Sequence, residues 1–432
     1  MFDRYWPRTR LAGLVLTAVL VVVGALSCDL PTARACPFCS DPMLTLAEQL
    51  AKSDAAVLVQ WVSAEMPDKE SVGSTTYVIV EVARSPGKPP ADAKKPAKTD
   101  SAEPGEAPAK PVVGSVLKSL EKGKRITLER HRAGKAGDLS ILLGSLTSSG
   151  AIEWGNPMEV TESLYQYMIQ APSPEAAPEK RLSYFLKFLE AADPVISGDA
   201  YQEFANAPYK DITALADKMP REKVRKWVSD PQISAGRLGL YGLMLGLCGT
   251  IEDSQIMEQK ILEKSEDYRL GIDGVMGGYL LLTGEGGLEV LESAKITDPK
   301  VPFSETYAAR QAILFLSSYS AGKIPQERLI KSLRLLLESR PEMADLTIAD
   351  LARMKDWGLQ DRLMELYGTD AFDVPAVKRS IVRFMIASTK DVPMGAAQQI
   401  PAHVEIAKRN IETLRKRDPK LVSEAEKFFF LQ

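Results

Sequence analysis

The feature that most constrains the fold is a segment that repeats in the second half of the chain. RLGLYGLMLG begins at Arg237, and RLGIDGVMGG begins at Arg269. Repeats of roughly 30 to 45 residues, each with an apolar helix, are typical of helical solenoids, in which neighbouring repeats complete one another's core. Diverged copies, with a polar first residue followed by a small residue and an apolar run, begin at Arg181, Arg310, Thr347 and Lys378.

This pattern resembles HEAT-type repeats over residues 179–390. The segment Asp193–Ala207 fits the resemblance, because Asp-Pro commonly opens a helix and Ala200 and Phe204 would then share one face. The resemblance implies an all-α HEAT-like solenoid and brings no activity with it. Residues 391–432 are predicted to form a helical tail after the solenoid.

Two residue types recur at fixed places in this template. Gly242 and Gly274 occupy the same place in two copies. Glycine inside a helix is less favourable than alanine by roughly 1 kcal/mol, so its recurrence predicts a close helix contact or a kink. Another place holds Met244, Met276, Met354 and Met385, which could form a soft-metal or adaptable binding stripe, but their helical spacing favours core packing.

The N-terminus indicates export. Residues 1–10 are basic, and Leu11–Ser27 follows without a charged residue, as in a signal peptide. The segment ARA (33–35) predicts a cut before Cys36, while the segment ALSC, ending at Cys28, resembles a lipoprotein acylation box. An uncleaved anchor is the third alternative, because the apolar run is close to the lower length limit for spanning a bilayer. Each alternative places the body of the chain outside the cytoplasm, in the periplasm, the cell envelope or the medium.

Between the signal and the repeats, short runs alternate apolar and polar residues, which is a strand pattern. Five or six short strands predict a small barrel or sandwich, and we expect a barrel over residues 36–165. Residues 85–111 are rich in proline and lack aromatic and bulky aliphatic residues, so we expect a disordered insertion there. The expected strands are Ala55–Glu65, Thr75–Ala83, Lys124–Arg130, Asp138–Ser145 and Ala151–Gly155, with Pro157–Glu162 as a strand that could close the barrel.

The predicted fold class is therefore α+β and multidomain, with a small OB-like β-barrel followed by an all-α HEAT-like solenoid. The predicted organisation is a signal peptide at 1–35, the barrel at 36–165 with its insertion at 85–111, the solenoid at 179–390 and a C-terminal helical tail at 391–432.

Composition argues against several classes of function. A net charge of −3 argues against nucleic-acid binding. The chain has two histidines, His131 and His403, which are too few for a histidine-rich metal site and leave few candidates for the base of a catalytic triad. We therefore predict no catalytic residue, metal or cofactor. The basic segment Glu129–Gly137 could bind an anion, although a polar hairpin connection is the simpler interpretation. Cys248, in an apolar run, is expected to behave as a small buried hydrophobe.

The candidate functional residues are Cys36 and Cys39, in the segment CPFC. They could form a redox pair, half of a metal site or a plain disulfide. A thioredoxin-type site needs the pair at the start of a helix that follows a strand, where the helix dipole lowers the thiol pKa. Here the export signal precedes the pair instead of a strand.

The region 36–165 also resembles the netrin-like module of tissue inhibitors of metalloproteinases. The resemblance lies in a mature chain that begins with Cys36, a second cysteine nearby, a short helix and a strand within Ser53–Glu65 that opens an OB-type barrel. It implies that the amine and carbonyl of Cys36 chelate the protease zinc. Two residues rather than one separate the cysteines here, and Cys248 alone remains as a distant partner. In that family, distant cysteines tie down the first strand, and these are missing here. An inhibitory N-terminus that no disulfide holds in place loses preorganisation, so the resemblance supports the fold more than the inhibitory function.

We therefore predict an exported, non-enzymatic interaction or scaffold protein that binds another protein through a helical-repeat surface. The first alternative is a thiol-disulfide or thiol-metal protein that uses Cys36 and Cys39. The second alternative is a netrin-like protease inhibitor. We expect no nucleic acid as partner, and a membrane only through an N-terminal anchor or a lipid on Cys28.

Overall fold

The computed structural model describes residues 36–39, 43–69, 71–86, 120–265, 267–319, 322–392 and 400–427. They belong to one compact unit, Ala35–Gln432. The expected signal peptide, and the expected insertion from residue 87 onward, lie outside the described residues. Within the described part of the chain, no helix is both long and apolar enough to cross a membrane.

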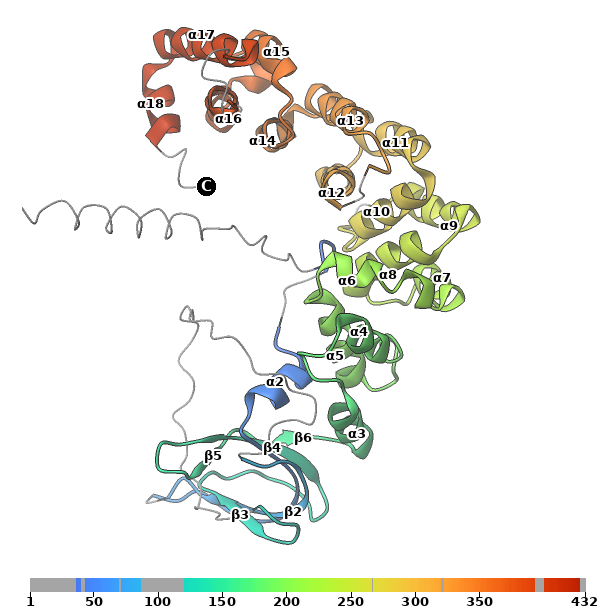
Figure 1. The fold of residues 1–432 in the computed structure, drawn as a ribbon, viewed down its shortest axis with the longest axis vertical. Coiled ribbons are helices and arrows are strands. Elements are labelled where there is room, and N and C mark those ends of the chain that lie inside the picture. Colours follow the sequence, from blue (N-terminus) through green and yellow to red (C-terminus); the bar gives the residue numbers. More distant parts are fainter. Residues whose placement is uncertain are drawn as a thin grey trace, which may run out of the picture. The chain divides into compact units, whose positions relative to one another are not determined.

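The first half of the chain forms one antiparallel sheet that curls into a nearly closed barrel (Figure 1). Its strand order is β3-β2-β1-β4-β5, and β6 pairs with β4 beside this path. Five of the expected strands are confirmed with their ends shifted by a few residues at most. The strands are β1 (Ala55–Glu65), β2 (Ser74–Arg84), β3 (Arg125–Leu128), β4 (Leu139–Leu146), β5 (Ile152–Trp154) and β6 (Met158–Glu159).

The barrel does not close as expected through the segment 157–162. That segment contributes the short β6, which pairs with Ser140 and Ile141 of β4 and leaves β3 at the edge. A side chain links the two edges instead. The Arg130 guanidinium, just after β3, donates to the carbonyl oxygens of Trp154 (3.0 Å) and Gly155 (2.7 Å) at the end of β5. The guanidinium also donates to the side-chain oxygen of Asn156, so the open edges are joined by three charge-assisted hydrogen bonds rather than by a strand ladder.

A short helix, α2 (Leu46–Lys52), precedes the sheet. Thr45 begins it with a capping box, because its hydroxyl accepts from the Glu48 amide and the Glu48 carboxylate accepts from the Thr45 amide. The barrel core is filled by alternate side chains of its strands, as the alternating sequence predicts. They include Val57, Val59, Tyr77, Ile79, Ile126, Leu128, Leu142 and Trp154.

Helices make up the rest of the described chain. They are α3 (Glu162–Gln170), α4 (Pro178–Phe185), α5 (Pro194–Ala205), α6 (Tyr209–Thr213), α7 (Arg221–Ser229), α8 (Ala235–Cys248), α9 (Ile251–Leu262), α10 (Ile272–Thr283), α11 (Glu285–Leu291), α12 (Phe303–Tyr319), α13 (Gln326–Ser339), α14 (Ala344–Arg353), α15 (Gln360–Leu366), α16 (Pro375–Lys390), α17 (Ala402–Arg417) and α18 (Pro419–Lys427), with short 3₁₀ or π turns between some of them.

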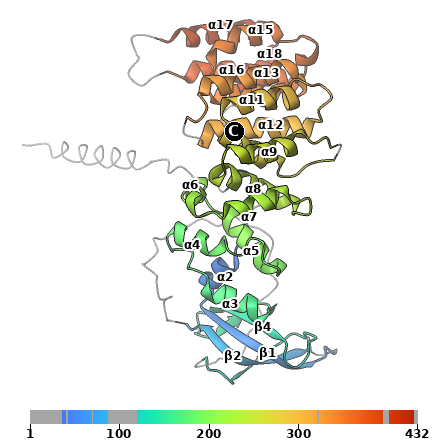
Figure 2. The same cartoon turned by 90° about the vertical axis from the view of Figure 1, so that its right-hand side faces the viewer.

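The repeated segments coincide with helices that pack on one another. The copies at Arg237 and Arg269 lie on α8 and at the start of α10, and these two helices pack together closely. Helix α10 also packs on α12, and α14 packs on α16, while α7, α9 and α13 flank this row (Figures 1 and 2). Asp193 caps α5 through the Val195 and Ile196 amides, as Asp-Pro predicts. Helices α17 and α18 pack against α16.

The recurring glycines mark the closest contact in the helical part. A Cβ atom on Gly242 would lie 2.6 Å from the backbone of Val275, and one on Gly274 would lie 2.2 Å from the carbonyl oxygen of Gly239. The prediction of a close helix contact is therefore confirmed. The template methionines lie in the core, because Met244, Met276 and Met385 are fully buried and Met354 is nearly so.

Candidate functional site: the Cys36–Cys39 loop and its seat

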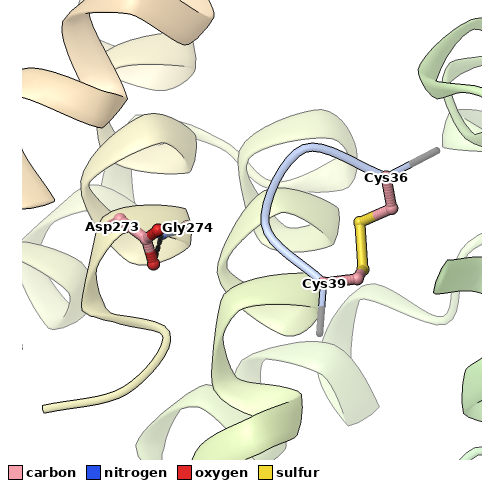
Figure 3. The surroundings of a disulfide bond; sticks show 4 residues. All are labelled: Cys36, Cys39, Asp273 and Gly274. Atoms are coloured by element: carbon pink, nitrogen blue, oxygen red, sulfur yellow. Dashed lines mark hydrogen bonds between the residues drawn. A yellow bond between two sulfur atoms is a disulfide. The ribbon is translucent and has the colours of Figure 1, made fainter. Parts of the chain in front are cut away.

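Cys36 and Cys39 form a disulfide that closes a four-residue loop, with their Cα atoms 5.4 Å apart. Figure 3 shows the bond on one side of the loop and helices around it. Cys36 is buried, with 6% of its surface exposed, while Cys39 is half-buried. The two residues singled out in the sequence are thus joined, and the remaining question is what the loop contacts.

Phe38, between the two cysteines, packs into the helical part of the chain. Its ring lies 4.8 Å, centroid to centroid, from the ring of Phe315 on α12. Glycines make room for it, since a Cβ on Gly277 would lie 2.7 Å from the Phe38 ring and one on Gly239 would lie 2.6 Å from the Phe38 carbonyl oxygen. The loop therefore contacts α8, α10 and α12 at once.

Residues 43–46, which follow the loop, lie along α5. The backbone amide of Met43 donates to Gln202, and the side-chain amide of Asn206 donates to the Met43 carbonyl, at 3.2 and 2.9 Å. The Leu46 amide donates to the Asp199 carboxylate at 2.6 Å. We call the described residues 36–39 and 43–53 the strap, because they run from this seat to the start of β1.

A buried group of polar side chains holds the strap. Asp199 accepts a hydrogen bond from the Tyr167 hydroxyl at 2.7 Å, and Glu203, one turn further along α5, lies 3.5 Å from Arg181. Burial raises the pKa of Glu203 to about 7, against the opposing effects of a hydrogen bond from Thr45 and the charge of Arg181. Burial also raises the pKa of Asp199.

Asp273, at the start of α10, is the carboxylate drawn near the loop in Figure 3. It accepts a hydrogen bond at 2.9 Å from the amide of Gly274, the next residue in the chain, and this amide also donates to the Gly271 carbonyl oxygen at 3.2 Å. Burial raises its pKa. Its hydrogen bond is therefore local to the first turn of α10 and does not reach the disulfide loop.

The surroundings of the disulfide lack the features that activate a thiol. The helix after the loop, α2, begins only at Leu46 and is capped by Thr45, so its N-terminus is not directed at either sulfur. No group of three or more metal-ligating side chains occurs among the described residues. What the loop does provide is a covalently closed wedge that places Phe38 between helices.

The other residues considered in the sequence lie elsewhere. Cys248 is a free, half-buried thiol near the end of α8, and burial raises its pKa to about 11, so it behaves as a hydrophobe. The ring of His403 stacks on Trp357 at 5.9 Å, far along the chain from His131. Neither histidine lies in a metal-ligating group of described residues.

The basic segment Glu129–Gly137 is a connection between β3 and β4, and its arginines differ in use. Arg130 joins the barrel edges, whereas Arg132 lines a cavity of about 370 Å³ together with Trp61 and Tyr77. The sequence did not indicate this cavity, because its walls come from elements that are distant in the chain: β1, β2, the β3–β4 connection, β4, the segment around β6, α3 and the start of α5.

No known protein family, curated protein or solved structure matches this chain.

Proposed function

We propose that the protein is an exported, non-enzymatic binding protein whose helical part is a HEAT-like solenoid that holds another protein. The copies of the repeated segment support the solenoid, because they lie on α8, α10, α12, α14 and α16, of which α8 packs on α10, α10 packs on α12 and α14 packs on α16. In such folds, the side chains that remain on the surface of the helices are the ones available to a partner.

One observation carries the binding proposal. Phe303 and Tyr307 stack on the surface of α12 with ring centroids 6.1 Å apart, and 48% and 38% of their surfaces are exposed. The guanidinium of Arg310 lies 5.4 Å from the centroid of the Tyr307 ring and pairs with Asp350 of α14 at 2.5 Å. We call Phe303 and Tyr307 the α12 patch.

The α12 patch has the properties of a binding anchor. Aromatic side chains dominate the energetic centres of protein interfaces. Tyr307 is already ordered by the buried Arg310–Asp350 pair beneath it, so little conformational entropy is lost when a partner covers it. Such a rigid aromatic surface suits a partner protein that presents an apolar side chain.

The geometry of the loop favours this function over the two alternatives. Thiol-disulfide exchange requires an accessible sulfur and a stabilised thiolate, whereas Cys36 is buried and Phe38 is wedged between helices. Zinc chelation by the Cys36 amine requires that nitrogen to be free, whereas it donates a hydrogen bond to the carbonyl oxygen of Ala205 at 3.1 Å. A structural disulfide needs neither property.

The test is affinity purification of the full chain from the envelope fraction of its own cells. The purification is then repeated with a variant in which both residues of the α12 patch are replaced by alanine. We expect a stoichiometric partner that is retained by the parent protein and lost from Phe303→Ala/Tyr307→Ala. The control is Leu262→Ala, which removes an exposed apolar side chain from α9. Equal recovery of the partner with all three proteins would refute the α12 patch, and mixed disulfides of client proteins with Cys39 would favour the thiol alternative.

A further inference from the structure

The backbone nitrogen of Cys36 occupies a specific place in the fold. It donates a hydrogen bond to the carbonyl oxygen of Ala205, 3.1 Å away. Ala205 is the last residue of α5, and it is buried, as is Ala207 beyond it. The last carbonyl groups of a helix have no donor within the helix, so the strap supplies one from a distant part of the chain.

The same nitrogen belongs to the peptide bond that follows the segment ARA (33–35), where small residues stand at the two positions that export peptidases read. A protease must take this bond into its cleft as extended, accessible chain. In the docked strap, the nitrogen of the bond is turned into the protein and Cys36 is 6% exposed. The docked strap therefore shields this bond from a protease, and we expect cleavage to take place before the strap docks.

We propose that removal of residues 1–35 turns the Cys36 nitrogen into an ammonium group that caps the C-terminus of α5 at Ala205. Hydrolysis of the bond adds one water, which leaves a carboxylate on the released segment and an amine on Cys36. A helix C-terminus carries partial negative charge, and a cation placed there is stabilised by it. A hydrogen bond from a charged donor is also stronger than the amide hydrogen bond it replaces.

The proposal explains why a cysteine follows the cut directly. The new terminus is held on one side by Ala205 and on the other by the disulfide to Cys39, so the ammonium cannot move away from α5 without moving Phe38. Processing of the N-terminus thereby becomes part of the folded structure rather than a separate event.

The experiment uses the full chain, exported by a host cell and purified from the envelope. Mass spectrometry of the N-terminal peptide is expected to show a chain that begins at Cys36. The mature protein is then treated with an amine-acylating reagent at neutral pH. We expect the Cys36 amine to react about tenfold or more slowly than in the same protein unfolded in urea, because reaction requires the strap to open.

The matched control inserts Gly-Ser between Ala35 and Cys36, so that the same cut leaves the ammonium two residues away from Ala205. We expect its terminal amine to react at the unfolded rate, and its melting temperature to lie below that of the parent. A mature chain that retains residues 29–35, a diacylglycerol on Cys28, or equal acylation of parent and control would each overturn the proposal. Partner binding through the α12 patch is unaffected by this insertion, so the two proposals fail independently.

Discussion

At the scale of single residues, the glycines between α8 and α10 give a prediction of stability. Gly242→Leu should destabilise the protein by on the order of 1 to 3 kcal/mol, because the added side chain meets the backbone of Val275 and forces the helices apart. Gly242→Ala should also destabilise, since even a Cβ would lie 2.6 Å from that backbone. Urea unfolding followed by circular dichroism measures both changes.

The matched control is Gly198→Ala within α5, where an added Cβ would meet nothing within 4 Å. There the usual helix preference for alanine applies, and stability should rise by up to about 1 kcal/mol. If Gly242→Ala and Gly198→Ala change the free energy of unfolding in the same direction, the packing of α8 on α10 is not as described.

Glu203 gives a prediction of pH dependence. Burial raises its pKa in the folded protein to about 7 from an ordinary value of 4.5. Folding therefore favours the protonated form, and the stability that Glu203 contributes is complete below pH 4.5 and is lost as the pH rises through 7. The loss is on the order of 3 kcal/mol. The charged groups that face it are Arg181, Asp199 and Glu48.

Glu203→Gln should make this part of the pH profile less steep, with the remaining slope coming from groups such as Asp199, and should leave the variant more stable than the parent at pH 8. Thermal melts between pH 4.5 and 8 provide the measurement. Glu405→Gln is the control, because Glu405 is exposed and pairs with Lys408 on the surface of α17, so its profile should follow the parent. A Glu203→Gln profile as steep as that of the parent would contradict the assignment.

Two residues illustrate which parts of the structure could be predicted from the sequence and which could not. Gly242 was recognisable because a glycine at one place of two copies signals contact between neighbours in the repeat. Phe38 was not recognisable, because its partners, Phe315 and Gly277, are hundreds of residues away and no periodic pattern links them. The sequence singled out the two cysteines but not the wedge that they enclose.

At the scale of elements, the strands were predictable and the barrel closure was not. Alternation of apolar and polar residues sets the ends of β1 and β2 locally. Closure depends on which edges meet, and here a side chain of the β3–β4 connection performs it. Nothing in the segment Glu129–Gly137 distinguishes Arg130 from Arg132 before the fold is known.

This closure gives a third prediction. Arg130→Ala should leave the carbonyl oxygens of Trp154 and Gly155 without their guanidinium donor and should loosen β5 from β3. Amide hydrogen exchange in β5 should become faster, while exchange in β1, which pairs on both sides, should change little. Arg132→Ala is the matched control, since its side chain lines the cavity. Unchanged exchange in β5 would show that the edges do not depend on Arg130.

At the scale of the whole unit, the strap connects parts that are far apart in the chain. It ends where β1 begins, it lies along α5, and Phe38 reaches α10 and α12. Helices that were coupled only to their nearest neighbours could unfold in steps, as in solenoid proteins. A segment that contacts helices from three places in the series makes their unfolding more cooperative.

The fourth prediction tests this coupling. Phe38→Ala should cost about 3 to 5 kcal/mol, because it empties the space between α10 and α12. Combination with Phe315→Leu in a double-mutant cycle should show a coupling energy of about 0.5 kcal/mol or more, since the two rings are in contact. The control cycle pairs Phe38→Ala with Val374→Ala, an exposed position before α16, and should be additive.

Because the disulfide holds Phe38 in this seat, Cys36→Ser/Cys39→Ser should destabilise the helices as well as the strap, and the melting of α10 and α12 should separate from that of α16. If the double cysteine variant melts in one transition at the parent temperature, the loop is a surface feature and the strap does not unite the helices.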